Sequence, residues 1–183
     1  MIITVQKAKA FLGISDNSKD MQIEEKLKAL EITIRNLTNN KFQDKKVRTI
    51  GNYLIEGNKV KGIDFLALGF RKDNTIEISG SILNDGIYEI IEVDNNSMTL
   101  NRELESESTL QTLITKIVYP YDIVEGVIKL LDYDFKMSDK IGIKSETISR
   151  YSVTYYDVNS SENIEGYPSS LMKFLNKYKK LRC

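Results

Sequence analysis

Residues 64–101, which read DFLALGFRKDNTIEISGSILNDGIYEIIEVDNNSMTLN, constrain the fold of this chain more than any other stretch. Apolar and polar residues alternate there in short runs, and Gly, Asn and Asp separate the runs. These three residue types tolerate a positive φ, so the pattern predicts short strands joined by tight turns. Helical periodicity precedes and follows the stretch. We therefore expect a small β-rich insert inside a helical domain, an arrangement that favours assembly over chemistry.

Two helices are predicted before the insert. Thr4 suits the N-cap of a short helix over residues 5–12, and Gly13 suits the position that ends it. A longer helix is expected over residues 19–38, because its apolar residues are spaced for one helical face. These are Ile23, Leu27, Leu30, Ile34 and Leu37. The opposite face is expected to be solvated and carries Glu24, Lys28, Glu31 and Arg35.

The spacing of apolar residues changes from helical to alternating near Val47. The strands predicted from this alternation cover residues 47–55, 75–79, 87–93, 97–101 and 112–118. Short strands at such intervals are typical of a small sandwich or barrel. The acidic stretch 103–107 is predicted to be an exposed loop, and its three glutamates to be solvated rather than to bind a cation.

Pro120 marks the return to helix, and the broad apolar face of YDIVEGVIKLLDYDFKM predicts the central helix of a bundle. Gly126 lies within it and suits a close approach of another element. A strand is expected over residues 146–156, with no hairpin partner of its own. Pro168 is expected at the first position of a final helix over residues 169–181.

These predictions place the chain in the α+β class: a small helical bundle, an inserted sandwich-like or barrel-like subdomain, and a C-terminal strand plus short helix. The expected divisions are residues 1–46 for the first part of the helical core, 47–118 for the insert, and 119–183 for the second part. The chain has 183 residues, enough for one domain with an insertion.

The order of these elements resembles the head–tail connector proteins (adaptor or head-completion proteins) of long-tailed bacteriophages and prophages. In that family a Gly-x-x-Ser-Glu pattern precedes Tyr-Ser-Val, and a short helix opens at Pro and ends in basic residues. The first pattern is matched here by Gly142, Ser145, Glu146, Tyr151, Ser152 and Val153, and the helix by residues 168–182. The stretch NTIEISGSILNDGIYEIIEV is similar to a β module that phage proteins reuse, although simpler connectors lack such an insert.

The resemblance implies a structural subunit of the virion, made in the bacterial cytoplasm and located at the head–tail joint. It implies a ring, commonly of twelve subunits, that joins the portal vertex of the capsid to the tail. The partners would be the portal protein, a tail or second head-completion protein, and further copies of this chain. DNA would pass through the channel without sequence-specific contacts, and neither a membrane nor a cofactor is implied. An isolated subunit could be monomeric.

Two segments are candidates for the assembly contacts. A strand with free edges can add to the sheet of a neighbouring chain, which makes Tyr151, Val153 and Tyr155 candidates for contacts with the portal or between subunits. The alternative is that this strand packs on its own chain. The final helix carries Lys173, Lys177, Lys179, Lys180 and Arg182 with no acid. These could contact an acidic portal surface or DNA phosphates, or could simply be solvated.

The sequence gives little support for catalysis. Histidine is absent, the single cysteine is Cys183, and no nucleotide-binding or nucleophile motif occurs. The net charge of zero does not by itself indicate nucleic-acid binding. The alternative function is a nucleic-acid-binding module, in which an OB-like insert and the basic C-terminal helix contact DNA. The insert has few aromatic residues that could stack on bases, namely Tyr53, Phe65, Phe70 and Tyr88, which counts against this alternative.

Overall fold

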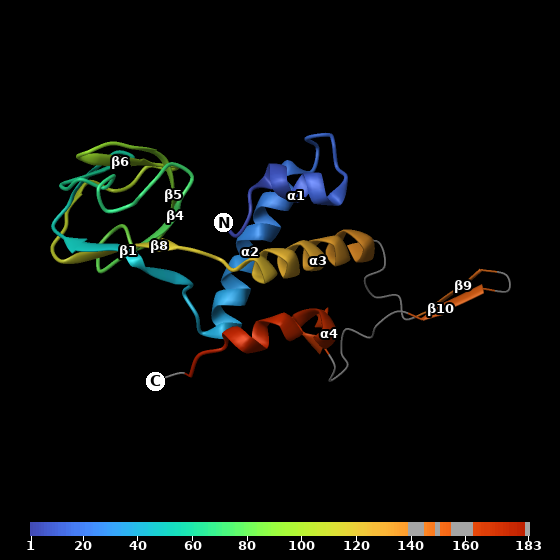
Figure 1. Ribbon diagram of the computed structural model, residues 1–183. Coiled ribbons are helices and arrows are strands. Elements are labelled where there is room, and N and C mark those ends of the chain that lie inside the picture. The colour runs from blue at the N-terminus through green and yellow to red at the C-terminus, as the bar shows by residue number, and fades with distance from the viewer. Residues whose placement is uncertain (139–144, 149–150, 155–162, 182–183) are drawn as a thin grey trace. The chain divides into compact units, whose positions relative to one another are not determined.

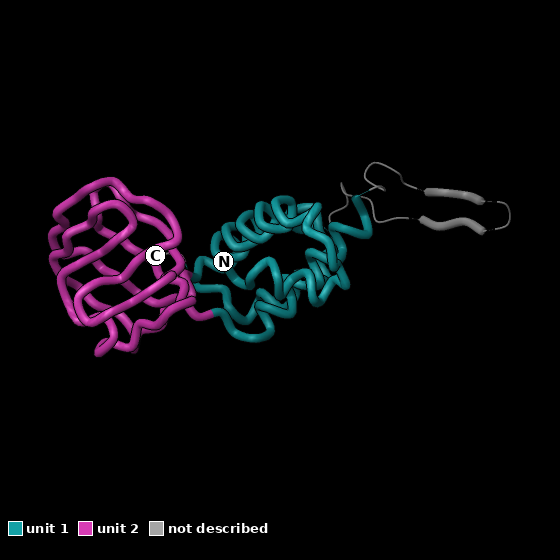
Figure 2. Tube along the Cα trace, turned by 90° about the horizontal axis from the view of Figure 1, so that it is seen from above, with its two compact units in different colours: residues 1–40, 119–183 teal, residues 41–118 magenta. Residues whose placement is uncertain are grey.

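The computed structural model describes residues 1–138, 145–148, 151–154 and 163–181 (Figure 1). The chain forms two compact units, which Figure 2 distinguishes by colour. Residues 1–40 and 119–183 form the helical unit, and residues 41–118 form the β unit between its two halves. The fold is therefore α+β with a β-rich insert, as predicted from the sequence.

The longest helices described in the helical unit form its framework. They are α1 (Val5–Leu12), α2 (Asp20–Thr38) and α3 (Tyr121–Met137). The Thr4 side chain accepts a hydrogen bond from the Lys7 amide at 3.3 Å, which caps α1. Gly13 ends this helix with a φ of 69°, a conformation that glycine adopts without the steric cost of a Cβ. The predicted bounds of α1 and α2 agree with the structure within one residue.

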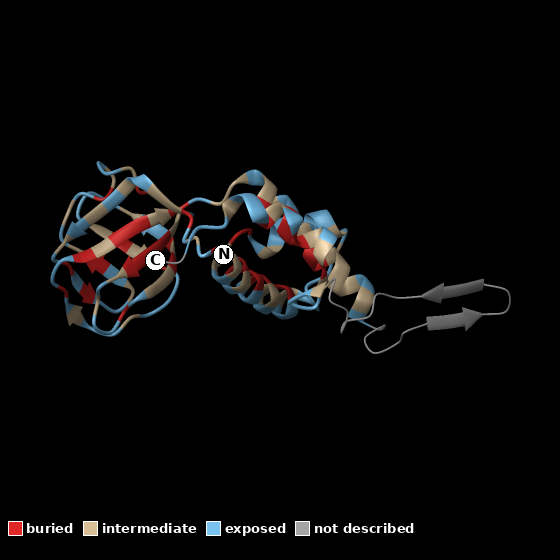
Figure 3. Cartoon of the chain, turned by 90° about the horizontal axis from the view of Figure 1, so that it is seen from below, coloured by how far each residue is buried: buried red, intermediate tan, exposed pale blue. Residues whose placement is uncertain are grey.

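The apolar faces of these helices form the core of the unit (Figure 3). Four of the five predicted residues of α2 are buried, namely Ile23, Leu27, Leu30 and Ile34. The broad face of α3 buries Ile123, Val127, Leu130 and Leu131. Both α1 and α2 contact α3, which confirms its central position.

One prediction about the solvated face of α2 is wrong. Glu31 is only 5% exposed, because its carboxylate accepts a hydrogen bond from the Tyr119 hydroxyl at 2.7 Å. The partner lies 88 positions away and could not be found from helical spacing. On α1, Ala8 is buried whereas Phe11 is 60% exposed.

The β unit contains eight strands. They are β1 (Gln43–Gly51), β2 (Leu54–Glu56), β3 (Lys59–Lys61), β4 (Thr75–Ser79), β5 (Gly86–Val93), β6 (Ser97–Leu100), β7 (Glu107–Ser108) and β8 (Thr112–Ile117). The strand order is β1-β8-β4-β5-β6-β3-β2-β7, and each pairing is antiparallel. Because β1 runs into β2 and β7 runs into β8, the two ends of this order meet. The sheet therefore closes on itself as a barrel, one of the two predicted architectures.

The interior of the barrel holds one apolar cluster. Its members include Tyr53, Ile55, Ile76, Ile78, Ile90, Met98, Leu100 and Ile114. Phe65 and Phe70, from the connection between β3 and β4, are fully buried in the same cluster and contact each other edge to face. This connection therefore contributes to the barrel core and is not only a surface loop.

The short strands were the hardest to predict. The predicted strand 47–55 is two strands, because the chain bends at Asn52 and Tyr53, and the pairing of β1 with β8 shifts between Gln43 and Arg48. Strands β3 and β7 were not predicted. Three or two residues are too few to show an alternating pattern.

Among the described residues after α3 there are two small hairpins. Strands β9 (Ser145–Ile148) and β10 (Tyr151–Thr154) pair with each other, and so do β11 (Asn163–Ile164) and β12 (Tyr167–Pro168). The expectation of one strand over 146–156 without a hairpin partner is therefore wrong. The final helix also differs from the prediction: α4 (Ser169–Met172) continues as a 3₁₀-helix, η2 (Lys173–Tyr178), and Pro168 precedes the first helical residue.

Candidate assembly surfaces

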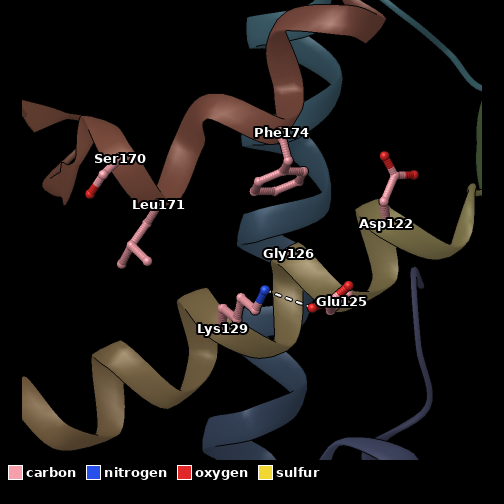
Figure 4. A pocket seen from close by; sticks show the side chains of 7 residues that line it. All are labelled: Asp122, Glu125, Gly126, Lys129, Ser170, Leu171 and Phe174. Carbon is pink, nitrogen blue, oxygen red and sulfur yellow. Dashed lines mark ion pairs between the residues drawn. The ribbon is translucent and has the colours of Figure 1, made fainter.

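The C-terminal segment is fixed to the helical unit along its length. Met172 and Leu175 are buried, and Phe174 lies against Gly126 of α3 (Figure 4). Beside them is a pocket of about 230 Å³, lined by Gly126, Leu171, Phe174 and four polar residues. One wall of this pocket is α3 and the other is the α4–η2 segment. The basic segment is therefore a docked part of the fold and not a free arm.

A carboxylate of α3 neutralises one of the predicted contact lysines. Lys177 forms an ion pair with Asp122, and the Tyr178 hydroxyl donates to Asp122 Oδ1 at 2.5 Å. Partial burial acts to raise the pKa of Asp122, but the bonds from Lys177 and Tyr178 outweigh it and lower this pKa. The charge of Lys177 is thus partly neutralised by a carboxylate of the same chain.

The end of the segment is tied to the C-terminus of α2. The Lys180 amide donates to the Thr38 carbonyl at 2.7 Å, and the Asn39 side chain donates to the Leu181 carbonyl at 2.9 Å. These are backbone contacts, so the side chains of Lys179 and Lys180 remain exposed, as does that of Lys173. The predicted contact residue Arg182 lies outside the described residues.

The beginning of the segment is held by Asp134 of α3. Its Oδ2 accepts hydrogen bonds from the Tyr167 hydroxyl and from Lys26 Nζ, each at 2.8 Å. The pKa of Tyr167 is raised, by burial first and then by the carboxylate, since both disfavour the phenolate. These contacts fix where the segment starts after the β9–β10 hairpin.

The β9–β10 hairpin carries Tyr151 and Val153, two of the other predicted contact residues. Tyr151 pairs with Ile148 and Val153 pairs with Glu146. Within the described part of the chain this is a two-stranded sheet, so each strand has one edge without a strand partner. Tyr155 lies outside the described residues. The structure brings Tyr151 and Val153 together on one strand, and it places the lysines on a separate element.

A further organised loop was not predicted. The carboxylate of Glu107 accepts hydrogen bonds from four donors in residues 81–84, including the Ile82 amide at 2.8 Å and the Ser81 hydroxyl at 2.5 Å. Burial acts to raise the pKa of Glu107, but these bonds lower it overall. Glu107 is therefore a loop-fixing residue, whereas Glu103 and Glu105 are exposed, as expected for the acidic stretch.

The barrel offers little support for base stacking. Tyr53, Phe65, Phe70 and Tyr88 are all at most 4% exposed, so their rings belong to the core. Among the described residues there is also no cluster of acidic side chains and cysteine that could hold a metal ion. No helix in the described part of the chain is both long enough and apolar enough to cross a membrane.

Comparison with known proteins gives one family. Residues 2–67 match the model of the phage gp6-like head-tail connector protein family. The match covers α1, α2 and the first three strands of the barrel, and it ends before α3 and the C-terminal segment. A search of the curated proteins found no match.

Proposed function

Because residues 2–67 match the model of the phage gp6-like head-tail connector protein family, we propose that this chain is a head–tail connector that forms a ring between the portal vertex and the tail of a virion. The family supports a structural connector role and interactions with portal and tail proteins. The ring, its lining of the DNA passage and the residues that make its contacts are our proposals. The observation that carries the role is the family match over the N-terminal helices, which pack on α3 and so define the helical unit.

The β9–β10 hairpin is our candidate for contact with the portal or a neighbouring subunit. Backbone N–H and C=O groups along an unpaired edge can bind a strand of another chain, which gives affinity with little dependence on side chains. The pairing of Tyr151 with Ile148 supports an ordered two-stranded sheet as the element presented. On this proposal Tyr151, Val153 and Tyr155 mark the strand that is extended.

The exposed lysines of the C-terminal segment are our second candidate. Lys173, Lys179 and Lys180 have no acidic partner among the described residues, whereas Lys177 is paired with Asp122. These three lysines form a basic surface suited to an acidic protein face or to DNA phosphates, and Arg182, which lies outside the described residues, follows them in the sequence. Each such contact is weak, but contacts repeated around a ring add to a stable joint.

A phage that lacks this protein tests the role. A stop codon early in its gene is expected to yield filled or leaking heads and separate tails, because the joint between them is missing. Electron micrographs and infectious titre measure this outcome. Complementation with the wild-type gene should restore tailed particles, and Glu92→Lys, a charge reversal on the exposed end of β5, is a control that should also restore them. Tailed, infectious particles without the protein would overturn the proposal.

A further inference from the structure

The connection between β4 and β5 exposes apolar side chains to solvent. Ile82 is 89% exposed and Leu83 is 59% exposed, and Leu110, close to the segment that binds this loop, is 75% exposed. Single exposed apolar residues are common on soluble proteins. Ile82 and Leu83 are adjacent in the loop and form an apolar patch of the kind that marks an interaction site.

The loop is held in one conformation by bonds to its neighbours. Glu107 accepts from the amides of Ile82 and Leu83, and the Asp85 side chain accepts from the Ser81 amide at 2.7 Å. The Asn84 side chain exchanges two hydrogen bonds with the backbone of Glu105, each at 2.9 Å. A loop ordered in advance loses little conformational entropy when a partner binds.

Acidic side chains lie within this loop and along the segment whose backbone is bonded to it. Asp85, Glu103 and Glu105 are exposed, and none of them forms an ion pair within the described residues. The nearby cation is Arg102, whose guanidinium lies over the Tyr88 ring at 4.4 Å. The patch therefore combines an apolar centre with a net negative border, and it fits an apolar side chain flanked by cations.

The C-terminal segment of the helical unit has the complementary pattern. Leu181 is 91% exposed and follows the exposed Lys179 and Lys180. The contacts of the Lys180 amide with Thr38 and of the Leu181 carbonyl with Asn39 hold this backbone while the side chains point to solvent. A preorganised Lys-Lys-Leu motif therefore exists on the same chain as the acidic, apolar patch.

We propose that the loop of residues 80–85, with its acidic border, binds residues 179–181 of a second copy of this chain. A contact between two different surfaces of identical subunits is heterologous, and such contacts generate rings when the rotation closes. The proposal thus rests on the ring assumed in the proposed function and names one contact within it. Apolar burial of Ile82, Leu83 and Leu181 would supply affinity, and the opposite charges would set the register.

Charge reversal tests the contact in full-length protein. Self-association is measured by sedimentation velocity at low ionic strength, up to about 1 mM protein, a range that detects weak interfaces. The double variant Glu103→Lys/Glu105→Lys and the double variant Lys179→Glu/Lys180→Glu should each weaken association about tenfold, whereas a mixture of the two should associate again. The controls are Glu92→Lys and Lys46→Glu, single charge reversals of each sign at exposed positions elsewhere on the barrel.

Each result has a defined meaning. Recovery in the mixture supports the contact, because only paired surfaces of opposite charge can compensate each other. If the wild-type protein associates but the mixture of the two double variants does not, the proposed contact is overturned, while the proposal of a ring is unaffected. A wild-type protein that stays monomeric up to about 1 mM also overturns the proposed contact. In that case, tailless particles from the phage with the stop codon would still support the connector role. Ile82→Ser/Leu83→Ser should weaken association without any change in charge, and unchanged association would count against the proposal.

Discussion

Gly126 of α3 and Phe174 of the C-terminal segment contact each other so closely that a Cβ at position 126 would overlap the phenyl ring. The missing side chain therefore allows the segment to lie against the central helix (Figure 4). Glycine inside a helix costs about 1 kcal/mol relative to alanine. This close packing gives a structural reason for the glycine at that position.

Gly126→Ala should destabilise the helical unit by about 1–2 kcal/mol, because overpacking outweighs the gain in helix propensity. Urea unfolding followed by circular dichroism measures the change. The control is the same substitution in a Phe174→Ala background, where space for the methyl group exists. There, alanine at position 126 should be neutral or stabilising, and an equal loss in both backgrounds would contradict this packing.

Asp122→Asn should lower the free energy of unfolding by about 1 kcal/mol near neutral pH, because the bonds from Lys177 and Tyr178 are weakened. The pKa of Asp122 is lowered in the folded state. Its contribution is therefore complete above the ordinary pKa of about 3.9 and is lost as the pH falls through the lowered value. The difference between wild type and variant should be constant above about pH 5 and should shrink below about pH 4.

Glu125→Gln is the control for this pH dependence. Within the described part of the chain Glu125 pairs only with Lys129, in an exposed i,i+4 contact, and such pairs contribute little, about 0.5 kcal/mol or less. A pH profile of Glu125→Gln that matched the profile of Asp122→Asn would show that the effect is one of general charge and not of the contact with the C-terminal segment.

Glu107→Gln should loosen residues 81–84 without unfolding the barrel, because an amide replaces a carboxylate that accepts four hydrogen bonds. Hydrogen exchange at the Ile82 and Leu83 amides should accelerate about tenfold, which corresponds to about 1.4 kcal/mol. Glu105→Gln is the matched control, since its side chain is exposed. Equal acceleration in both variants would refute the special role of Glu107.

Proline substitutions distinguish the two edges of β10. Two residues separate Ile148 from Tyr151, and for such a hairpin the alternation of hydrogen-bonded pairs directs the Tyr151 and Val153 amides toward β9. The amide of Ser152 then faces the outer edge. Val153→Pro should disrupt the hairpin itself, whereas Ser152→Pro should leave it paired and block strand addition.

Both proline variants should remain soluble and should fail to restore tailed particles. Nuclear magnetic resonance of the hairpin amides checks that Ser152→Pro keeps its pairing. If tailed, infectious particles formed with Ser152→Pro at wild-type frequency, this edge would not be the site of strand addition.

The helices of the N-terminal half and the class of the fold could be predicted because their signals are local. The Thr4 cap, the Gly13 stop and the apolar face of α2 each involve neighbours in sequence. The C-terminal helix was predicted too long, since its apolar spacing suits a helix while contacts of Tyr178 and Lys180 with distant residues shape its end. Similarly, the buried Glu31 and the loop-fixing Glu107 depend on partners 88 and about 25 positions away.

The barrel illustrates the same limit. Turn residues predicted where the longer strands of the barrel lie. Closure of the barrel, however, depends on the pairing of β1 with β8 and of β2 with β7, which are separated by more than half of the insert in sequence. The burial of Phe65 and Phe70 follows from this closure and not from their local sequence. For that reason the sequence alone could not show that the aromatic residues considered for base stacking are buried in the barrel core.

The most direct test of the connector role is a tagged pull-down of this protein from cells that are producing the phage, with mass spectrometry of the proteins recovered. The account predicts recovery of the portal protein together with tail or head-completion proteins, because the chain joins these two parts of the virion. Recovery of nucleic acid or of a metabolic complex, without any virion protein, would contradict it.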